Sequence, residues 1–180
     1  MLFPWKRGGS GGYPRRLLDG GAGKPQGIRN GTGLVLQSLA LTHSWPLYEA
    51  AERMPALVRP ALAEQAGMAA PIGLWTCRLA DEALDWSPAV HALFGLPEGE
   101  PLERALTVSL YLPESRLQME ALRAYAIKHG RGFTLDAQIR RPDGERRWMR
   151  LSAMPIIEGR SVVRLAGTKQ DVTADYDGPG

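Results

Sequence analysis

The C-terminal third of the chain alternates between apolar and polar residues with the period of β-strands. In residues 133–140 every second side chain is apolar, which is the pattern of a strand with one buried face. Residues 148–157 and 161–172 are two further strand-like runs. Turn-forming sequences separate the three runs, namely Pro142-Asp143-Gly144 and Glu158-Gly159. Three strands joined by such short turns predict an antiparallel meander.

The residues before the meander predict two more strands and a short helix. Residues 73–79 and 84–86 have the composition and alternation of strands. A helix is expected at 88–94, because Ser87 is a favourable N-cap and a proline occupies the first helical position. Gly95 is suited to end this helix.

A longer helix is predicted for residues 113–129, after a mixed region of loop and short helix. Glu114 lies in its first turn and Lys128 and His129 in its last, so the charges match the helix dipole, and Gly130 follows as the stop. A small sheet cannot leave both faces uncovered, so we expect this helix to pack on it. The predicted fold class is α+β, with a five-stranded antiparallel sheet and helices on one face.

A series of short motifs, in order along the chain, resembles a PAS domain over about residues 67–175. The upstream motifs are Gly73-Leu74-Trp75, Trp86-Ser87-Pro88 leading to Leu93-Phe94-Gly95, and Leu112-Pro113-Glu114-Ser115-Arg116. The downstream motifs are Arg141-Pro142-Asp143-Gly144, Trp148-x-Arg150, and Gly167 followed by Gln170-Asp171-Val172-Thr173. This last motif is similar to the Asp-x-Thr signature that ends many bacterial PAS domains.

The resemblance implies a signal-coupling site where the chain leaves the domain. We expect Arg150, on the Trp148-x-Arg150 strand, to form a charge-assisted pair with Asp171 of the motif that ends at Thr173. The alternative is an ordinary surface pair worth about 0–1 kcal/mol. In PAS relatives this exit drives an output helix.

The resemblance also implies a space between the long helix and the sheet in which relatives bind small molecules. Strand and helix periodicity gives the expected pocket walls as Leu74, Leu93, Leu122, Tyr125, Leu135, Ala137, Met149, Leu151, Val163 and Leu165. The same residues could equally form a filled core, so the sequence leaves the ligand, and whether there is one, unknown.

Two cofactors of PAS relatives are not expected here. Light-sensing relatives carry a flavin-reactive cysteine in a mid-domain helix, but Cys77 lies on the first predicted strand, where a small buried apolar role suits it better. Haem-binding relatives use a histidine within the long helix, whereas His129 is at its end and His91 is on the short helix. We expect no metal site.

Charge and glycine set the N-terminal region apart. Residues 1–33 hold ten of the 21 glycines and six basic side chains against one acidic, whereas the remainder carries a net charge of −2. We expect a disordered tail at 1–33, short flanking helices or a linker at 34–66, the PAS domain at 67–175 and disorder at 176–180. Scattered charges that are not regularly interleaved with aromatic residues are typical of a solvated tail and make no strong case for nucleic acid or membrane.

The function expected from these features is sensing without catalysis. No nucleotide-binding loop, zinc-protease motif or serine-nucleophile motif is present, so no catalytic residue is predicted. With one cysteine and neither a signal peptide nor a membrane-length apolar run, a cytoplasmic protein is expected.

Three roles remain open. The first is a stand-alone bacterial signalling module, of the kind used in two-component systems, that binds itself as a homodimer or another signalling protein and is gated by a small ligand. The second is the sensor part of a histidine kinase or diguanylate cyclase whose output domain lies elsewhere. The third is a structural dimerisation module. A C-terminus that ends in glycine and proline favours the first and third roles.

Overall fold

The computed structural model describes residues 38–40, 42–58 and 71–177. The tail predicted at 1–33 lies outside these residues, as do parts of the predicted flanking region. Within the described part of the chain, no helix is both long and apolar enough to span a membrane.

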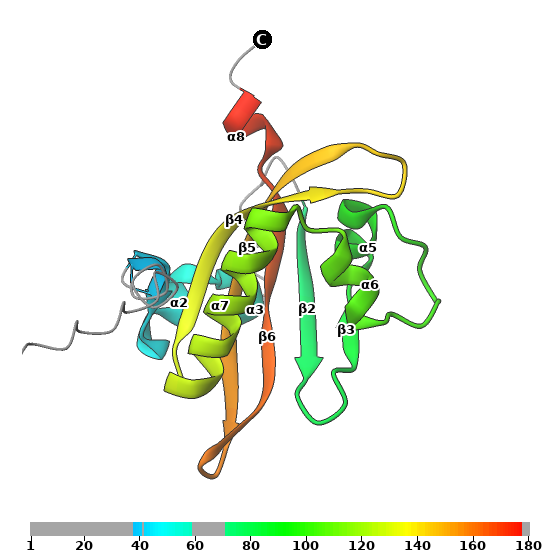
Figure 1. Cartoon of the computed structure of the whole chain (residues 1–180). Helices are drawn as coiled ribbons and strands as arrows, with labels where there is room; N and C mark the ends of the chain where they lie inside the picture. The colour runs from blue at the N-terminus through cyan, green and yellow to red at the C-terminus, as the bar shows by residue number, and fades with distance from the viewer. Residues whose placement is uncertain (1–37, 41, 59–70, 178–180) are drawn as a thin grey trace, which may run out of the picture.

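The centre of the fold is one antiparallel sheet (Figure 1). Its strand order is β1-β4-β5-β6-β2-β3, and all neighbouring pairs are antiparallel. The strands are β1 (Ser44–Trp45), β2 (Ile72–Arg78), β3 (Leu84–Trp86), β4 (Gly132–Arg140), β5 (Arg146–Glu158) and β6 (Ser161–Asp171). The predicted meander is confirmed, because β4, β5 and β6 are neighbours in the sheet and their bounds lie within two residues of the expected ones.

The sheet has one strand more than the five expected. Strand β1 comes from the flanking region where only helices or a linker were predicted, and it pairs Ser44 and Trp45 with Phe133 and Gly132. Trp45 is almost fully buried and donates its indole N–H to Thr134 Oγ1 over 3.1 Å. A Cβ on Gly132 would overlap the Trp45 ring, so the glycine is what lets the indole lie against the strand. A strand of two residues is too short to show an alternating pattern, so the sequence did not predict it.

The helices divide between the two faces of the sheet (Figure 1). One face, called here the inner face, is covered by α5 (Pro88–Phe94), α6 (Arg104–Ser109) and α7 (Pro113–His129). Short N-terminal elements lie beyond the other, outer face: η1 (Leu47–Glu49), α2 (Ala50–Arg53) and α3 (Pro55–Val58), of which α3 contacts β2 and β6. Helix α8 (Thr173–Asp177) follows β6 directly.

Helix α7 has the bounds and the ends that the sequence predicts. Gly130 adopts a left-handed φ of 61° and its N–H bonds to the carbonyl of Ala126, which closes the last turn. The helix buries one stripe against the inner face, formed by Ser115, Met119, Leu122 and Ala126. At the other side of the helix Leu117 is 73% exposed, so only the stripe belongs to the core.

The short helix α5 is also confirmed, but its cap differs from the prediction. Ser87 occupies the N-cap position, where its carbonyl accepts from the N–H groups of Val90 and His91. Its hydroxyl makes no capping bond and instead accepts a 2.9 Å hydrogen bond from the N–H of Leu74. Gly95 ends the helix in a left-handed conformation, as expected. Ser87 therefore ties the start of α5 to strand β2.

Candidate functional site

A small cavity lies between the inner face of the sheet and helices α6 and α7. Its volume is about 50 Å³. The apolar walls come from strands β2 to β6 and from the two helices, and they are completed by three cationic side chains. The lining residues are Trp75, Cys77, Leu84, Trp86, Arg104, Thr107, Val108, Tyr111, Met119, Arg123, Phe133, Leu151, Leu165 and Lys169.

The most unusual wall residue is Lys169 on β6. It pairs with Gly73 on β2 and Leu151 on β5, which places it on the inner face, and only 6% of it is exposed. Its ammonium nitrogen lies 4.5 Å from the ring centres of both Trp86 and Phe94. Trp75 and Tyr111 lie somewhat farther away, at 5.4 and 6.0 Å.

Among the described residues the ammonium has neither a hydrogen bond nor an ion pair, and these four rings surround it. Cation–π attraction offsets part of the cost of burying the charge, by about 0.5–2 kcal/mol per favourable ring contact. Desolvation outweighs it and lowers the pKa of Lys169 to about 7. The cavity therefore contains an amine that gains or loses its proton near neutral pH.

Other polar groups of the cavity wall are also unpaired or hidden from water. The indole N–H groups of Trp75 and Trp86 are buried and have no acceptor. Burial raises the pKa of the Tyr111 phenol, so this group is neutral at any physiological pH. The guanidinium groups of Arg104 and Arg123 also line the cavity and form ion pairs with Glu82, and Arg104 pairs in addition with Glu120.

Only two of the predicted pocket walls line this cavity, namely Leu151 and Leu165. Leu122, Leu135, Ala137 and Met149 are buried in the core, and Leu93 is buried beside a different groove. Leu74, Tyr125 and Val163 are only half-buried and do not line it.

The prediction for β2 was wrong because it chose the wrong face of the strand. Gly73, Trp75 and Cys77 face inward, whereas Leu74 faces outward. Apolar residues occur on both faces of β2, because α3 covers part of the outer side, so alternation alone could not choose between them.

Sequence reasoning missed Lys169 and the aromatic residues around it. Lys169 follows Leu165 and Gly167 at every second position of β6, so strand alternation gives the three residues the same face. Continuing this alternation by one step would have predicted that Lys169 also faces the core. Cys77, expected to be a small buried residue, is 3% exposed and does line the cavity.

A second cluster lies where the chain leaves the sheet for α8, on the outer face. The rings of Trp148 on β5 and Tyr176 on α8 stack with centres 4.0 Å apart and planes 10° from parallel. The Tyr176 hydroxyl donates to Asp136 Oδ2 over 2.8 Å. Arg150 donates to both carboxylate oxygens of Asp136 over 2.8 and 2.6 Å. Trp148, Arg150, Asp136 and Tyr176 are called here the exit latch.

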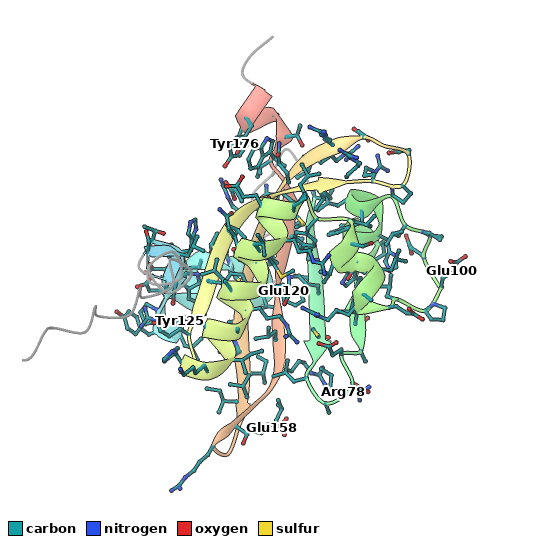
Figure 2. The ribbon with its side chains drawn as sticks, in the orientation of Figure 1. Arg78, Glu100, Glu120, Tyr125, Glu158 and Tyr176 are labelled. Atoms are coloured by element: carbon teal, nitrogen blue, oxygen red, sulfur yellow. The ribbon has the colours of Figure 1, made fainter. Side chains whose placement is uncertain are left out.

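Burial alone would raise the pKa of Asp136, but the hydrogen bonds from Arg150 and Tyr176 hold it below its usual value. The carboxylate is therefore charged at neutral pH and acts as the common acceptor of the latch. The hydrogen bond from Tyr176 to Asp136 and the stacking of Tyr176 on Trp148 join α8 to β4 and β5. Tyr176 is labelled beside α8 in Figure 2.

The predicted pair between Arg150 and Asp171 is wrong. Asp171 lies opposite Met149 in the β5–β6 register and Arg150 lies opposite Gln170, so the two side chains leave opposite faces of the sheet. Arg150 pairs with Asp136 instead, and Asp171 accepts from Arg147 over 2.9 Å. The sequence spacing could not reveal this because it depends on strand register.

The closing motif does join the central strand to the exit, through other atoms. The N–H of Trp148 donates to Thr173 Oγ1 over 3.0 Å, and the N–H of Val172 donates to the carbonyl of Trp148 over 2.9 Å. Asp171 Oδ1 accepts from the N–H of Thr173 over 3.0 Å. A groove of about 500 Å³ adjoins this motif, between it and α5. Thus three of the four predicted coupling residues meet at the start of α8, and their role stays a prediction.

No catalytic or metal-binding constellation is evident in these two clusters. Within residues 38–40, 42–58 and 71–177, no group of three or more His, Cys, Asp or Glu side chains could hold a metal ion. His91, considered above as a haem ligand, is buried with its ring edge against Trp86, and His129 packs on Tyr125 at the end of α7.

The family model described as "PAS fold" matches residues 83–169. Among solved structures, the N-terminal domain of a diguanylate cyclase with PAS/PAC sensor from Marinobacter aquaeolei is 18% identical with a TM-score of 0.55, over 59% of this chain and 99% of that one. A sensory box histidine kinase/response regulator from Burkholderia thailandensis is 22% identical with a TM-score of 0.54, over 66% and 87%.

A domain of a putative light and redox sensing histidine kinase from Haloarcula marismortui is 18% identical with a TM-score of 0.54, over 64% of this chain and 100% of that one. No curated protein matches the chain. At these identities the likeness to the solved structures extends to the fold alone.

Proposed function

We propose that this chain, whose residues 83–169 match the family model of the PAS fold, is a sensory module that converts a change in the inner cavity into a change at the exit latch. It acts through protein–protein interaction rather than catalysis. The partner is a second copy of the chain or another signalling protein, and α8 with the groove beside it is the surface that responds.

One observation carries this proposal: the same strands border the cavity on one face and hold the latch on the other. On β5, Leu151 lines the cavity, whereas Trp148 and Arg150 belong to the outer face. On β6, Lys169 lines the cavity only four residues before α8 begins at Thr173. A shift of either strand that accommodates a cavity occupant must therefore also displace part of the latch.

A second candidate role is that of a sensor for an enzyme domain located elsewhere. The neighbours from Marinobacter aquaeolei and Burkholderia thailandensis are, by description, parts of a diguanylate cyclase and a histidine kinase, which favours this role. Both roles use the same exit, so one experiment on the coupling between cavity and latch tests them together.

The test is to fill the cavity by substitution and to follow α8 by hydrogen–deuterium exchange. Val108 on α6 is buried and lines the cavity, so Val108→Phe adds bulk there at an overpacking cost of about 1–3 kcal/mol. We expect exchange in residues 173–177 to become several-fold faster, because the added bulk displaces β5 and β6 and so strains the exit latch on the other face of the sheet.

Leu106→Phe is the matched control, since this residue lies on the same helix but is 48% exposed. It should leave exchange in 173–177 unchanged. Exchange that is equally unchanged in a folded Val108→Phe protein would contradict the proposed coupling, whatever ligand the cavity takes.

A further inference from the structure

The inner cavity presents three buried hydrogen-bond donors, one of them the Lys169 ammonium, without a matching acceptor among the described residues. Lys169, Trp75 and Trp86 are each more than nine-tenths buried, and none of their side-chain nitrogen atoms has an acceptor among the described residues. An unpaired buried donor costs about 1–3 kcal/mol, and more if it is charged. A group with two acceptor oxygens and a negative charge would satisfy these donors together.

The charges around the cavity point to the same chemistry. Lys169 faces Cys77 on β2, Arg104 on α6 and Arg123 on α7 across the cavity, and the described walls include no aspartate or glutamate. The carboxylates nearby, Glu82 and Glu120, pair with the arginines and do not line the cavity. The two arginines and these two glutamates cancel in formal charge, so Lys169 is the unbalanced cation of the described cavity wall, and an anion would balance it.

The volume of the cavity and its apolar wall residues limit the size and the chemistry of the part of the ligand beyond the charged group. A water molecule needs on the order of 10–15 Å³, so a cavity of about 50 Å³ holds about three to five non-hydrogen atoms. Leu84, Val108, Met119 and Leu151 supply apolar contacts for a short hydrocarbon portion. Acetate and propionate have this size and this division into a charged and an apolar end.

We propose that the cavity binds a short monocarboxylate of two or three carbon atoms, with its carboxylate on the Lys169 ammonium and within reach of the Trp75 and Trp86 indole N–H groups. This inference rests on the proposed sensory function and gives it a ligand class. The carboxylate replaces the water that the buried ammonium has lost, and its methyl or ethyl group fills the apolar side of the cavity.

Binding should be linked to protonation of the amine. Because Lys169 has a pKa of about 7 when the cavity is free, a growing share of the protein lacks the charge as the pH rises above 7. The bound anion stabilises the ammonium, so at pH 8 binding takes up close to one proton. Affinity should be about tenfold weaker at pH 8 than at pH 6, because the protonated share of an amine with this pKa falls about tenfold.

The experiment is isothermal titration calorimetry of the full chain with sodium propionate at pH 6 and pH 8, in two buffers of different ionisation enthalpy. Propionamide serves as the neutral ligand of equal shape. We expect propionate to bind with the stated pH dependence and proton uptake, and propionamide to bind at least tenfold more weakly.

Three variants sharpen the result. Lys169→Met keeps the length of the side chain and should abolish propionate binding, whereas Trp86→Phe removes one indole N–H and should weaken it several-fold. Lys128→Met, at an exposed lysine on α7, should leave it unchanged.

Propionate binding that survives Lys169→Met, or equal binding of propionamide, would overturn the proposal, and so would the absence of any propionate binding at pH 6. These outcomes leave the Val108→Phe exchange experiment unaffected. Failure of the ligand class and failure of cavity-to-latch coupling are thus told apart.

Discussion

Lys169 is a basic residue in an environment that disfavours its charged form. A lysine on an inner sheet face places an ammonium among aromatic rings, without a carboxylate beside it among the cavity walls. Its pKa falls from 10.5 to about 7 because burial disfavours the charged form. In the unfolded chain the amine keeps its ordinary pKa, so folding is opposed by the charge at neutral and acid pH.

The sign of the pH dependence follows from these two pKa values. Between pH 7 and pH 10.5 the unfolded state binds the proton more fully than the folded state, so this residue makes stability rise with pH in that window. Below pH 7 both states are protonated and the cost is fully present. Replacement by an uncharged side chain of similar shape should remove this dependence.

We predict that Lys169→Met raises the free energy of unfolding by about 2–4 kcal/mol at pH 6 and by clearly less at pH 9. Urea denaturation at the two pH values measures the difference, and Lys128→Met is the control for loss of an exposed lysine. A Lys169→Met gain that is equal at both pH values would show that the buried amine does not titrate as argued.

At the scale of single elements, the exit latch is where β4, β5 and α8 meet. Asp136 is its shared acceptor, and Arg150 and Tyr176 both depend on it. The Arg150 side chain is 45% exposed and that of Asp136 18%, so solvent weakens their pair but does not cancel it.

We predict measurable coupling between Arg150 and Asp136 and additive behaviour between Arg150 and Asp171. In double-mutant cycles of unfolding free energy, Arg150→Ala with Asp136→Ala should show a coupling of about 0.5–1 kcal/mol. The cycle with Asp171→Ala is the matched comparison, because this carboxylate bonds to Arg147 on the other face. Coupling of equal size in both cycles would contradict the assignment of the latch.

How much of the structure could be predicted from the sequence depends on the type of feature. The bounds of α5, α7 and the three meander strands follow from local signals, because proline, glycine and alternating residues act within a few positions. The Arg150 partner depends on register between strands, and the face of β2 depends on a helix from a distant segment. Neither is encoded in the spacing of neighbouring residues, so the candidate site was predicted less well than the fold.

For the molecule as a whole, strand β1 links the N-terminal segment to the rest of the sheet. Strand β1 pairs with the edge of β4 that does not contact β5. Trp45 holds β1 in place, because it is only 2% exposed and its indole N–H donates a hydrogen bond to Thr134. His43 adds a ring-nitrogen contact of 2.9 Å to the Thr134 carbonyl. Without β1, the backbone groups of Gly132 and Phe133 at this edge of β4 would be open to pairing with another strand.

We predict that Trp45→Ala releases the segment containing β1 while the rest of the sheet stays folded. The substitution removes the indole ring that packs on Gly132, and loss of a buried tryptophan costs about 3–5 kcal/mol. Limited proteolysis should then cleave within residues 42–58 much faster than in the original protein. Tyr48→Ala, at an 85% exposed position of the same segment, should leave the rate unchanged. Equal resistance of Trp45→Ala would mean that other contacts hold the segment.

The two indoles beside Lys169, those of Trp75 and Trp86, have an optical consequence. Tryptophan emission responds to nearby charge, and the ammonium lies close to Trp86 and Trp75 in a place that bulk water scarcely reaches. Gain or loss of that single proton should therefore alter the intrinsic fluorescence of the protein. Trp75 and Trp86 thus act as intrinsic fluorescent probes, and the protonation state of Lys169 can be followed in solution without an added label.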